Sequence, residues 1–119
     1  MSNGTTISPQ MQTLMALDSK SRELNELASA LSHKMNGGPG DTTIQLRLRD
    51  IFAETTDISA RRAAIIGGGQ FTAPTAADVQ VLQDAITAAH TAIINSADVN
   101  TLLKLGTTLL SAYGSGKSL

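Results

Sequence analysis

The chain has 119 residues and a formal net charge of −1, and 41% of its residues are hydrophobic. This size fits a single domain, and the near-neutral charge lacks the basic excess of nucleic-acid-binding proteins, so no nucleic-acid partner is expected. The absence of cysteine excludes disulfides and thiolate zinc sites. Because the chain holds only two Phe, one Tyr and no Trp, the core must consist of aliphatic residues, which favours packed helices over a sandwich of sheets.

A targeting signal or a membrane-spanning segment would lie at the N-terminus or in a long apolar run. The stretch MSNGTTISPQ contains no Lys or Arg and no apolar run, so we expect no cleaved secretory signal. No apolar run reaches the roughly 18 residues that indicate a membrane-spanning helix. The sequence therefore predicts a cytoplasmic protein without a membrane partner, with an uncleaved export signal as the alternative.

The first helix is predicted over residues 9–35. Ser8 followed by Pro9 is typical of an N-cap with proline at the first helical position. Leu17, Leu24 and Leu31 recur every seven residues and mark an apolar stripe. The stretch NGGPGD at 36–41 should end this helix. The opposite, solvent-facing side is expected to hold Lys20, Arg22, Glu23, Glu26 and Lys34.

The segment 41–66 fits two patterns. Ile44, Leu46 and Leu48 alternate with polar residues, as in a strand. We favour a helix, because a lone strand would have no partner to pair with. Asp41 is the predicted N-cap of this helix, and one apolar face would hold Ile44, Leu48, Ile51, Phe52, Thr55, Ile58, Ile65 and Ile66.

Three consecutive glycines, Gly67 to Gly69, follow this segment. A phosphate-binding fingerprint would need a third glycine at Thr72, an upstream strand and a helix that starts at once. None of these is expected here, because the upstream segment has a helical pattern and the next helix starts only after Thr75. We therefore interpret the glycines as a helix terminator.

The clearest heptad pattern of the chain follows Thr75, which with Asp78 resembles a capping box. The stretch NSADV at 95–99 should separate this helix from a last one over 99–113, with Asn95 or Ser96 as its cap. The aliphatic spacing predicts a helix–helix interface, which we expect to include a second copy of the chain. The predicted interface residues are Val79, Leu82, Ile86, Ala89, Ile93, Leu102 and Leu109.

The charge distribution supports two interpretations of this second half. No Lys or Arg occurs between Arg62 and Lys104. A solvated helix usually carries more charge. The segment is therefore either a closely packed intramolecular hairpin or is also covered by another subunit.

Residues for catalysis or metal binding are sparse. The two histidines, His33 and His90, are too few for a metal cluster and are interpreted as polar surface or interface residues. Asp50, Glu54 and Asp57 share a helical face, but nearby arginines make ion pairs the favoured explanation. We expect no catalytic residue, no metal ligand and no cofactor.

Four arginines are the candidates for binding an anion. Arg47, Arg49, Arg61 and Arg62 lie in the second helical segment and could meet across the subunits of a symmetric assembly. The planar guanidinium group suits phosphate. A solvated or ion-paired face is the simpler explanation.

Together these features predict an all-α fold, a small antiparallel bundle of three or four helices that self-associates. Residues 8–113 would form one helical domain, with a flexible N-terminus at 1–7 and a flexible tail at 114–119. The predicted function is that of a non-enzymatic interaction or structural protein acting as a homo-oligomer, by analogy with bacterial or phage accessory proteins. The alternative is an oligomer that sequesters a small anionic ligand, such as a nucleotide, between subunits.

Overall fold

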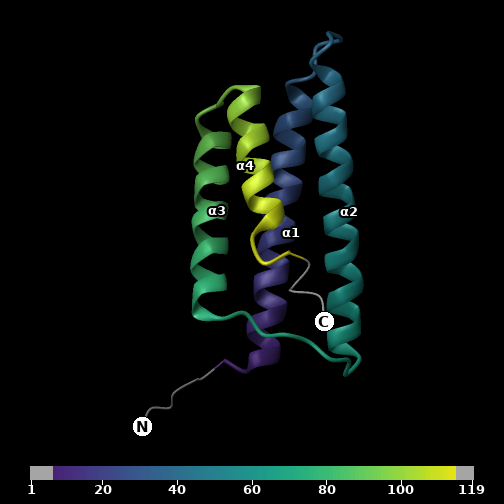
Figure 1. The fold of residues 1–119 in the computed structure, drawn as a ribbon, viewed down its shortest axis with the longest axis vertical. Helices are drawn as coiled ribbons and strands as arrows, with labels where there is room; N and C mark the ends of the chain where they lie inside the picture. Colours follow the sequence, from purple (N-terminus) through teal and green to yellow (C-terminus); the bar gives the residue numbers. More distant parts are fainter. Residues whose placement is uncertain (1–6, 115–119) are drawn as a thin grey trace.

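The computed structural model describes residues 7–114, and within that range the chain forms four helices and no strand. They are α1 (Pro9–His33), α2 (Asp41–Ile66), α3 (Ala76–Ile94) and α4 (Val99–Ser111). Consecutive helices run in opposite directions along a common long axis (Figure 1). The predicted all-α antiparallel bundle is confirmed. The predicted flexible ends lie outside the described residues, apart from Ile7 and Gly114.

The helix starts follow capping rules, with two corrections. Ser8 caps α1, and Thr75 forms a reciprocal capping box with Asp78 at α3, as predicted. The N-cap of α2 is Gly40 rather than Asp41. Asp41 instead accepts hydrogen bonds from the backbone N–H groups of the preceding loop. The N-cap of α4 is Asp98 rather than Asn95 or Ser96. The backbone of Asp98 is extended, and its carboxylate accepts a hydrogen bond from the N–H of Thr101.

The glycine stretch ends α2, as predicted. Gly67 is the C-cap, and Gly68 adopts a φ of +93° that side chains with a Cβ rarely tolerate. The N–H groups of Gly68 and Gly69 donate to the carbonyls of Ile65 and Ala64. These N–H groups therefore satisfy the end of the helix and do not form a phosphate cradle.

Helices α1 and α4 lie at the centre of the bundle, since each packs against all the other helices. Helix α2 packs mainly on α1 and α4, and α3 also packs on α1 and α4 from the other side (Figure 1). The α2–α3 connection runs across the lower end of the bundle. The hydroxyl of Tyr113 donates to the carbonyl of Thr72 at 2.6 Å and fixes this connection to the end of α4.

The core contains two rows of aliphatic residues at seven-residue spacing, one on α1 and one on α2. Every member is at most 2% exposed. The rows are Leu17, Leu24 and Leu31 on α1, and Ile44, Ile51, Ile58 and Ile65 on α2. Part of the predicted α2 face is wrong, because Phe52 and Ile66 are 73% and 65% exposed. Helix α2 lies at the outer edge of the bundle and buries only a narrow stripe.

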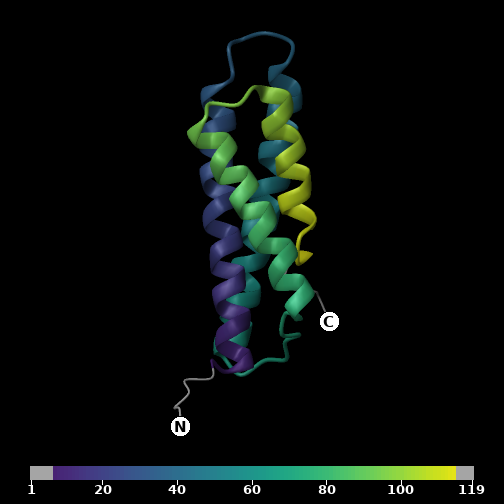
Figure 2. The same cartoon turned by 90° about the vertical axis from the view of Figure 1, so that its left-hand side faces the viewer.

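Helix α3 is inclined to α1. In the view of Figure 2 the two helices cross at an angle. Helix α4 has only 13 residues and covers the upper part of the bundle. Among the described residues, none of the helices combines the length and apolar character that a bilayer-spanning segment requires.

The narrow buried stripe of α2 gives a direct test of its orientation. We expect Ile51→Ala to lower the free energy of unfolding by about 2–5 kcal/mol, because it leaves a cavity at a buried site. Phe52→Ala, one residue further on the exposed side, should change it by less than about 0.5 kcal/mol. Urea unfolding followed by circular dichroism measures both; equal effects of the two variants would contradict the assigned face.

Candidate functional site

Two surface hollows lie along the seam between α1 and α3. One is an apolar groove beside the N-terminal halves of both helices, and the other is a more polar pocket near their C-terminal ends. The carboxylates of Glu23 and Glu26 and the imidazole of His90 meet along the same seam. These features share one face, which we call the α1–α3 face.

The groove has a volume of about 750 Å³. The described residues that line it carry no charged side chain. Its apolar walls come from the N-terminal halves of both helices. The lining residues are Ile7, Gln12, Met15, Ala16, Ser19, Pro74, Ala76, Val79, Leu82, Gln83, Ile86 and Thr87.

A row of exposed apolar side chains runs beside the groove. Ile7, Met11 and Met15 follow one another at intervals of four residues and are 45–50% exposed. Met11 and Met15 therefore lie on the same side of α1, and Ile7 precedes its N-cap Ser8. A continuous exposed apolar row marks a contact surface more strongly than the scattered Leu46 and Phe52 on α2 do.

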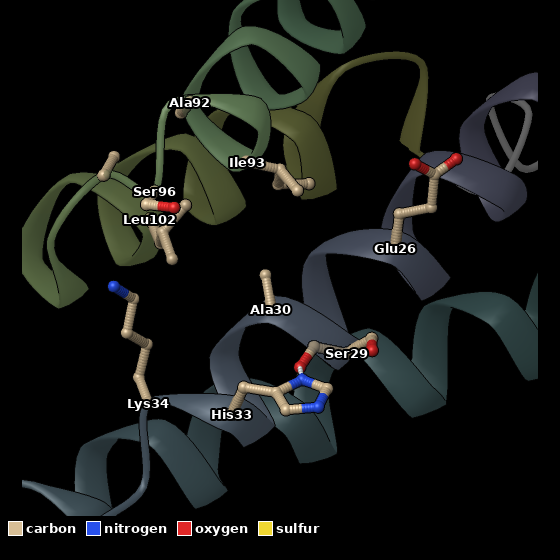
Figure 3. Close-up of a pocket in the computed structure, with 10 residues that line it drawn as sticks. Glu26, Ser29, Ala30, His33, Lys34, Ala92, Ile93, Ser96 and Leu102 are labelled. Carbon is tan, nitrogen blue, oxygen red and sulfur yellow. Dashed lines mark hydrogen bonds between the residues drawn. The ribbon is translucent and has the colours of Figure 1, made fainter.

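The second pocket, of about 500 Å³, lies between the C-terminal part of α1 and the α3–α4 turn. Glu26 and Lys34 lie at its opposite ends, with Ala30 and Ile93 between them (Figure 3). His33 turns back along its own helix, where its Nδ1 lies 2.8 Å from the carbonyl oxygen of Ser29. No set of side chains in this pocket converges on one point.

Glu23, Glu26 and His90 form a compact polar cluster. The His90 Nδ1 atom lies 3.8 Å from Glu23 Oε1 and 3.7 Å from Glu26 Oε1. The Glu23 side chain is only 7% exposed, whereas those of Glu26 and His90 are 45% and 52% exposed. The prediction that placed Glu23 on the solvent side is wrong, because α3 packs over this part of α1.

The buried carboxyl of Glu23 is poorly compensated. Burial raises its pKa above the ordinary value, the nearby carboxylate of Glu26 raises the pKa further, and His90 lowers it. Its Oε2 atom has no hydrogen-bond partner among the described residues. A buried carboxylate without a donor is costly, so this position calls for a proton or a cation.

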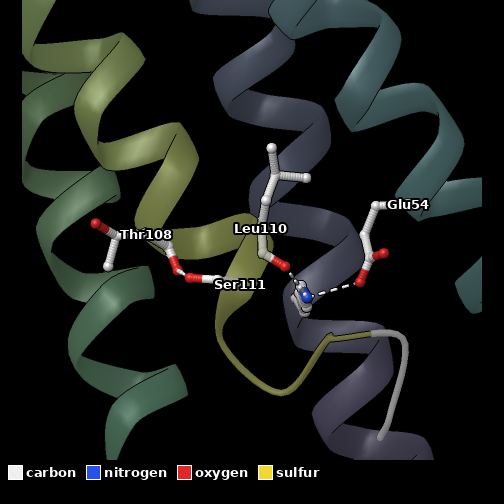
Figure 4. Close-up of polar contacts among 5 residues, drawn as sticks. Glu54, Thr108, Leu110 and Ser111 are labelled. Atoms are coloured by element: carbon white, nitrogen blue, oxygen red, sulfur yellow. Dashed lines mark hydrogen bonds and ion pairs between the residues drawn. The ribbon is translucent and has the colours of Figure 1, made fainter. Parts of the chain in front are cut away.

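Lys20 is also buried, contrary to the prediction that placed it on the solvent side. Its side chain is fully buried, and Nζ lies 2.7 Å from Glu54 Oε2 on α2. The same ammonium donates to the carbonyl of Leu110, near the end of α4, at 2.8 Å. The two dashed lines in Figure 4 lead from Glu54 and from the Leu110 carbonyl to this one nitrogen. Burial lowers the pKa of Lys20, and the contact with Glu54 counteracts this.

The predicted anion-binding arginines do not form one site within a single chain. Fourteen residues of helix separate Arg47 from Arg61, a distance of about 21 Å. Arg47 contacts Asp50 at 3.3 Å, and Arg62 lies 3.9 Å from Asp18. Ion pairing, the simpler explanation, therefore holds for these two. The carboxylate of Glu54 pairs with Lys20. A meeting of Arg49 or the others across subunits stays a prediction.

The predicted interface residues divide into two groups. Leu82, Ala89, Leu102 and Leu109 are buried within one chain, so they build its core. Val79, Ile86 and Ile93 are only partly buried, and each lines one of the two hollows. Both interpretations of the heptad pattern therefore remain compatible with the fold, and the contact with a second copy stays a prediction.

No family model, curated protein or solved structure matches this chain. The function must therefore be argued from the side chains themselves.

The buried ion pair between Lys20 and Glu54 can be tested by substitution. We expect Lys20→Met to lower the free energy of unfolding by about 3–5 kcal/mol, because it removes the charge that balances Glu54. The double variant Lys20→Met/Glu54→Leu should recover much of this loss, since the buried carboxylate is then gone as well. Thermal and urea unfolding of the unmodified protein, Lys20→Met, Glu54→Leu and the double variant measure the cycle; purely additive effects would show that the pair is not coupled.

The raised pKa of Glu23 predicts a pH dependence. The folded protein binds this proton more tightly than the unfolded chain, so its stabilising contribution is complete below the ordinary pKa of 4.5 and is lost as the pH rises through the folded value. We therefore compare the free energies of unfolding of the unmodified protein and of Glu23→Gln in metal-free buffer. As the pH rises from about 4 to about 7, the value for the unmodified protein should fall relative to that of the variant. A difference that stays constant over this range would contradict the assignment.

Proposed function

We propose that this chain is a non-enzymatic helical interaction protein that acts as a homo-oligomer through its α1–α3 face. The occupant of the apolar groove is then the same face of a second copy. The single observation that carries the proposal is the row of Ile7, Met11 and Met15, exposed beside an apolar groove whose described lining residues are all uncharged.

The absence of charge favours a second copy as the occupant. The chain carries a net charge of only −1, and the sequence has no Lys or Arg between Arg62 and Lys104. Two copies of the groove meet without like-charge repulsion, whereas a nucleic acid or an acidic membrane surface would find no basic side chain among the residues that line it.

The shape of the face suits a two-fold arrangement. In an isologous contact the same surface patch of both copies meets itself, so the methionine row of one copy can enter the groove of the other. Methionine side chains are flexible and fill irregular apolar gaps well. Val79 and Ile86, the partly buried members of the predicted interface, would be covered in the same contact.

The oligomeric state tests this proposal. The unmodified protein should show a mass that is a multiple of 12.4 kDa in light scattering or sedimentation. Met15→Glu places a charge in the contact and should shift the mass toward that of one chain, because burying an unpaired carboxylate is costly. Met15 is half exposed in the single chain, so the helical circular dichroism should remain.

Phe52→Glu is the matched control. It introduces the same charge at a more exposed apolar residue on α2, away from the groove, and should leave the mass unchanged. A protein that stays monomeric up to high concentration would overturn the proposal. Dissociation by Phe52→Glu but not by Met15→Glu would move the contact to α2.

A further inference from the structure

We propose that Glu23, Glu26 and His90 bind a divalent transition-metal ion that links α1 to α3. One candidate ligand atom from each of these residues lies within 4.8 Å of those of the other two. Glu23 and Glu26 are three residues apart and therefore face the same side of α1. His90 faces them from α3. This inference does not depend on self-association.

The two distances from His90 need only a small contraction to match a zinc site. Zinc bonds of about 2.1 Å in a tetrahedral site place neighbouring ligand atoms about 3.4 Å apart. The His90 Nδ1 atom is 3.8 Å and 3.7 Å from the nearest oxygens of Glu23 and Glu26. The half-exposed side chains of Glu26 and His90 can move to close the remaining gap, while the buried Glu23 provides a fixed ligand.

The second observation is an unpaired buried oxygen on Glu23. Its Oε2 atom is buried and has no hydrogen-bond partner in the described part of the chain. The nearest lysine along α1, Lys20, directs its ammonium to Glu54 and to the Leu110 carbonyl instead. Helix α3 offers no Lys or Arg at all. A cation between the two carboxylates and His90 would supply the missing positive charge.

The donor set indicates which class of metal would bind. Mg²⁺ and Ca²⁺ prefer sites built entirely from oxygen ligands. One imidazole nitrogen with two carboxylate oxygens suits zinc and its neighbours in the first transition row, and three protein ligands leave one position open to water. Bound metal would hold α3 against α1.

Zinc chloride is the probe for the first experiment. Isothermal titration at neutral pH should give one zinc per chain. The melting temperature should rise by about 10 °C at a zinc concentration about a hundredfold above the dissociation constant. His90→Ala and Glu23→Gln should each weaken binding by more than about a hundredfold, because each removes a direct ligand, whereas loss of an outer-shell partner costs less.

His33→Ala is the matched control, since it removes the other histidine of the chain and should leave zinc binding unchanged. Glu23→Gln must also remain folded by circular dichroism, so that loss of binding reports the ligand and not the fold. The proposal is overturned if zinc does not stabilise the protein, or if His33→Ala abolishes binding while His90→Ala retains it. A ratio of one zinc per two chains that changes with protein concentration would likewise overturn it, because the ion would then join copies and not helices.

Discussion

The buried ammonium of Lys20 connects three of the four helices at one point. It extends from α1, pairs with Glu54 on α2 and donates to the Leu110 carbonyl in the last turn of α4. Carbonyls at the end of a helix lack intrahelical donors, so this bond also terminates α4. Because a buried charge is tolerated only with well-placed partners, the positions of all three helices depend on this contact.

Much of the fold follows from local sequence signals. Ser8, Thr75 and the glycines after Ile66 mark helix ends through chemistry confined to a few residues, which is why those predictions hold. The orientation of α2 does not follow in the same way. Its sequence offers a broad apolar face, and only the packing at the edge of the bundle decides that Ile51 is buried and Phe52 is exposed. The burial of Lys20 is equally a result of tertiary packing, because a lysine beside an apolar stripe ordinarily points to water.

The candidate site was less accessible to sequence reasoning. Glu23 and His90 are far apart along the chain, and neither lies in a recognisable metal motif. The three-residue spacing of Glu23 and Glu26 indicates that they share one side of a helix, but nothing in the sequence indicates that His90 lies opposite them. The heptad pattern of α3 predicted an apolar contact without distinguishing the chain's own helices from a second copy. Val79 and Ile86 are partly buried in the groove, whereas Leu82 and Ala89 are core residues, of which Leu82 also lines the groove, and only the packing of α3 assigns these roles.

The seven-residue spacing of the core has a consequence for alignment. Equivalent leucines on α1 face equivalent isoleucines on α2, so sliding one helix along the other by one heptad, about 10.5 Å, would again match aliphatic side chains with aliphatic side chains. Apolar packing alone therefore distinguishes poorly between neighbouring registers. Sliding would carry Glu54 away from Lys20 and leave a buried charge unmatched. One ion pair thus selects a single register from a repetitive core, as single polar residues do in coiled coils.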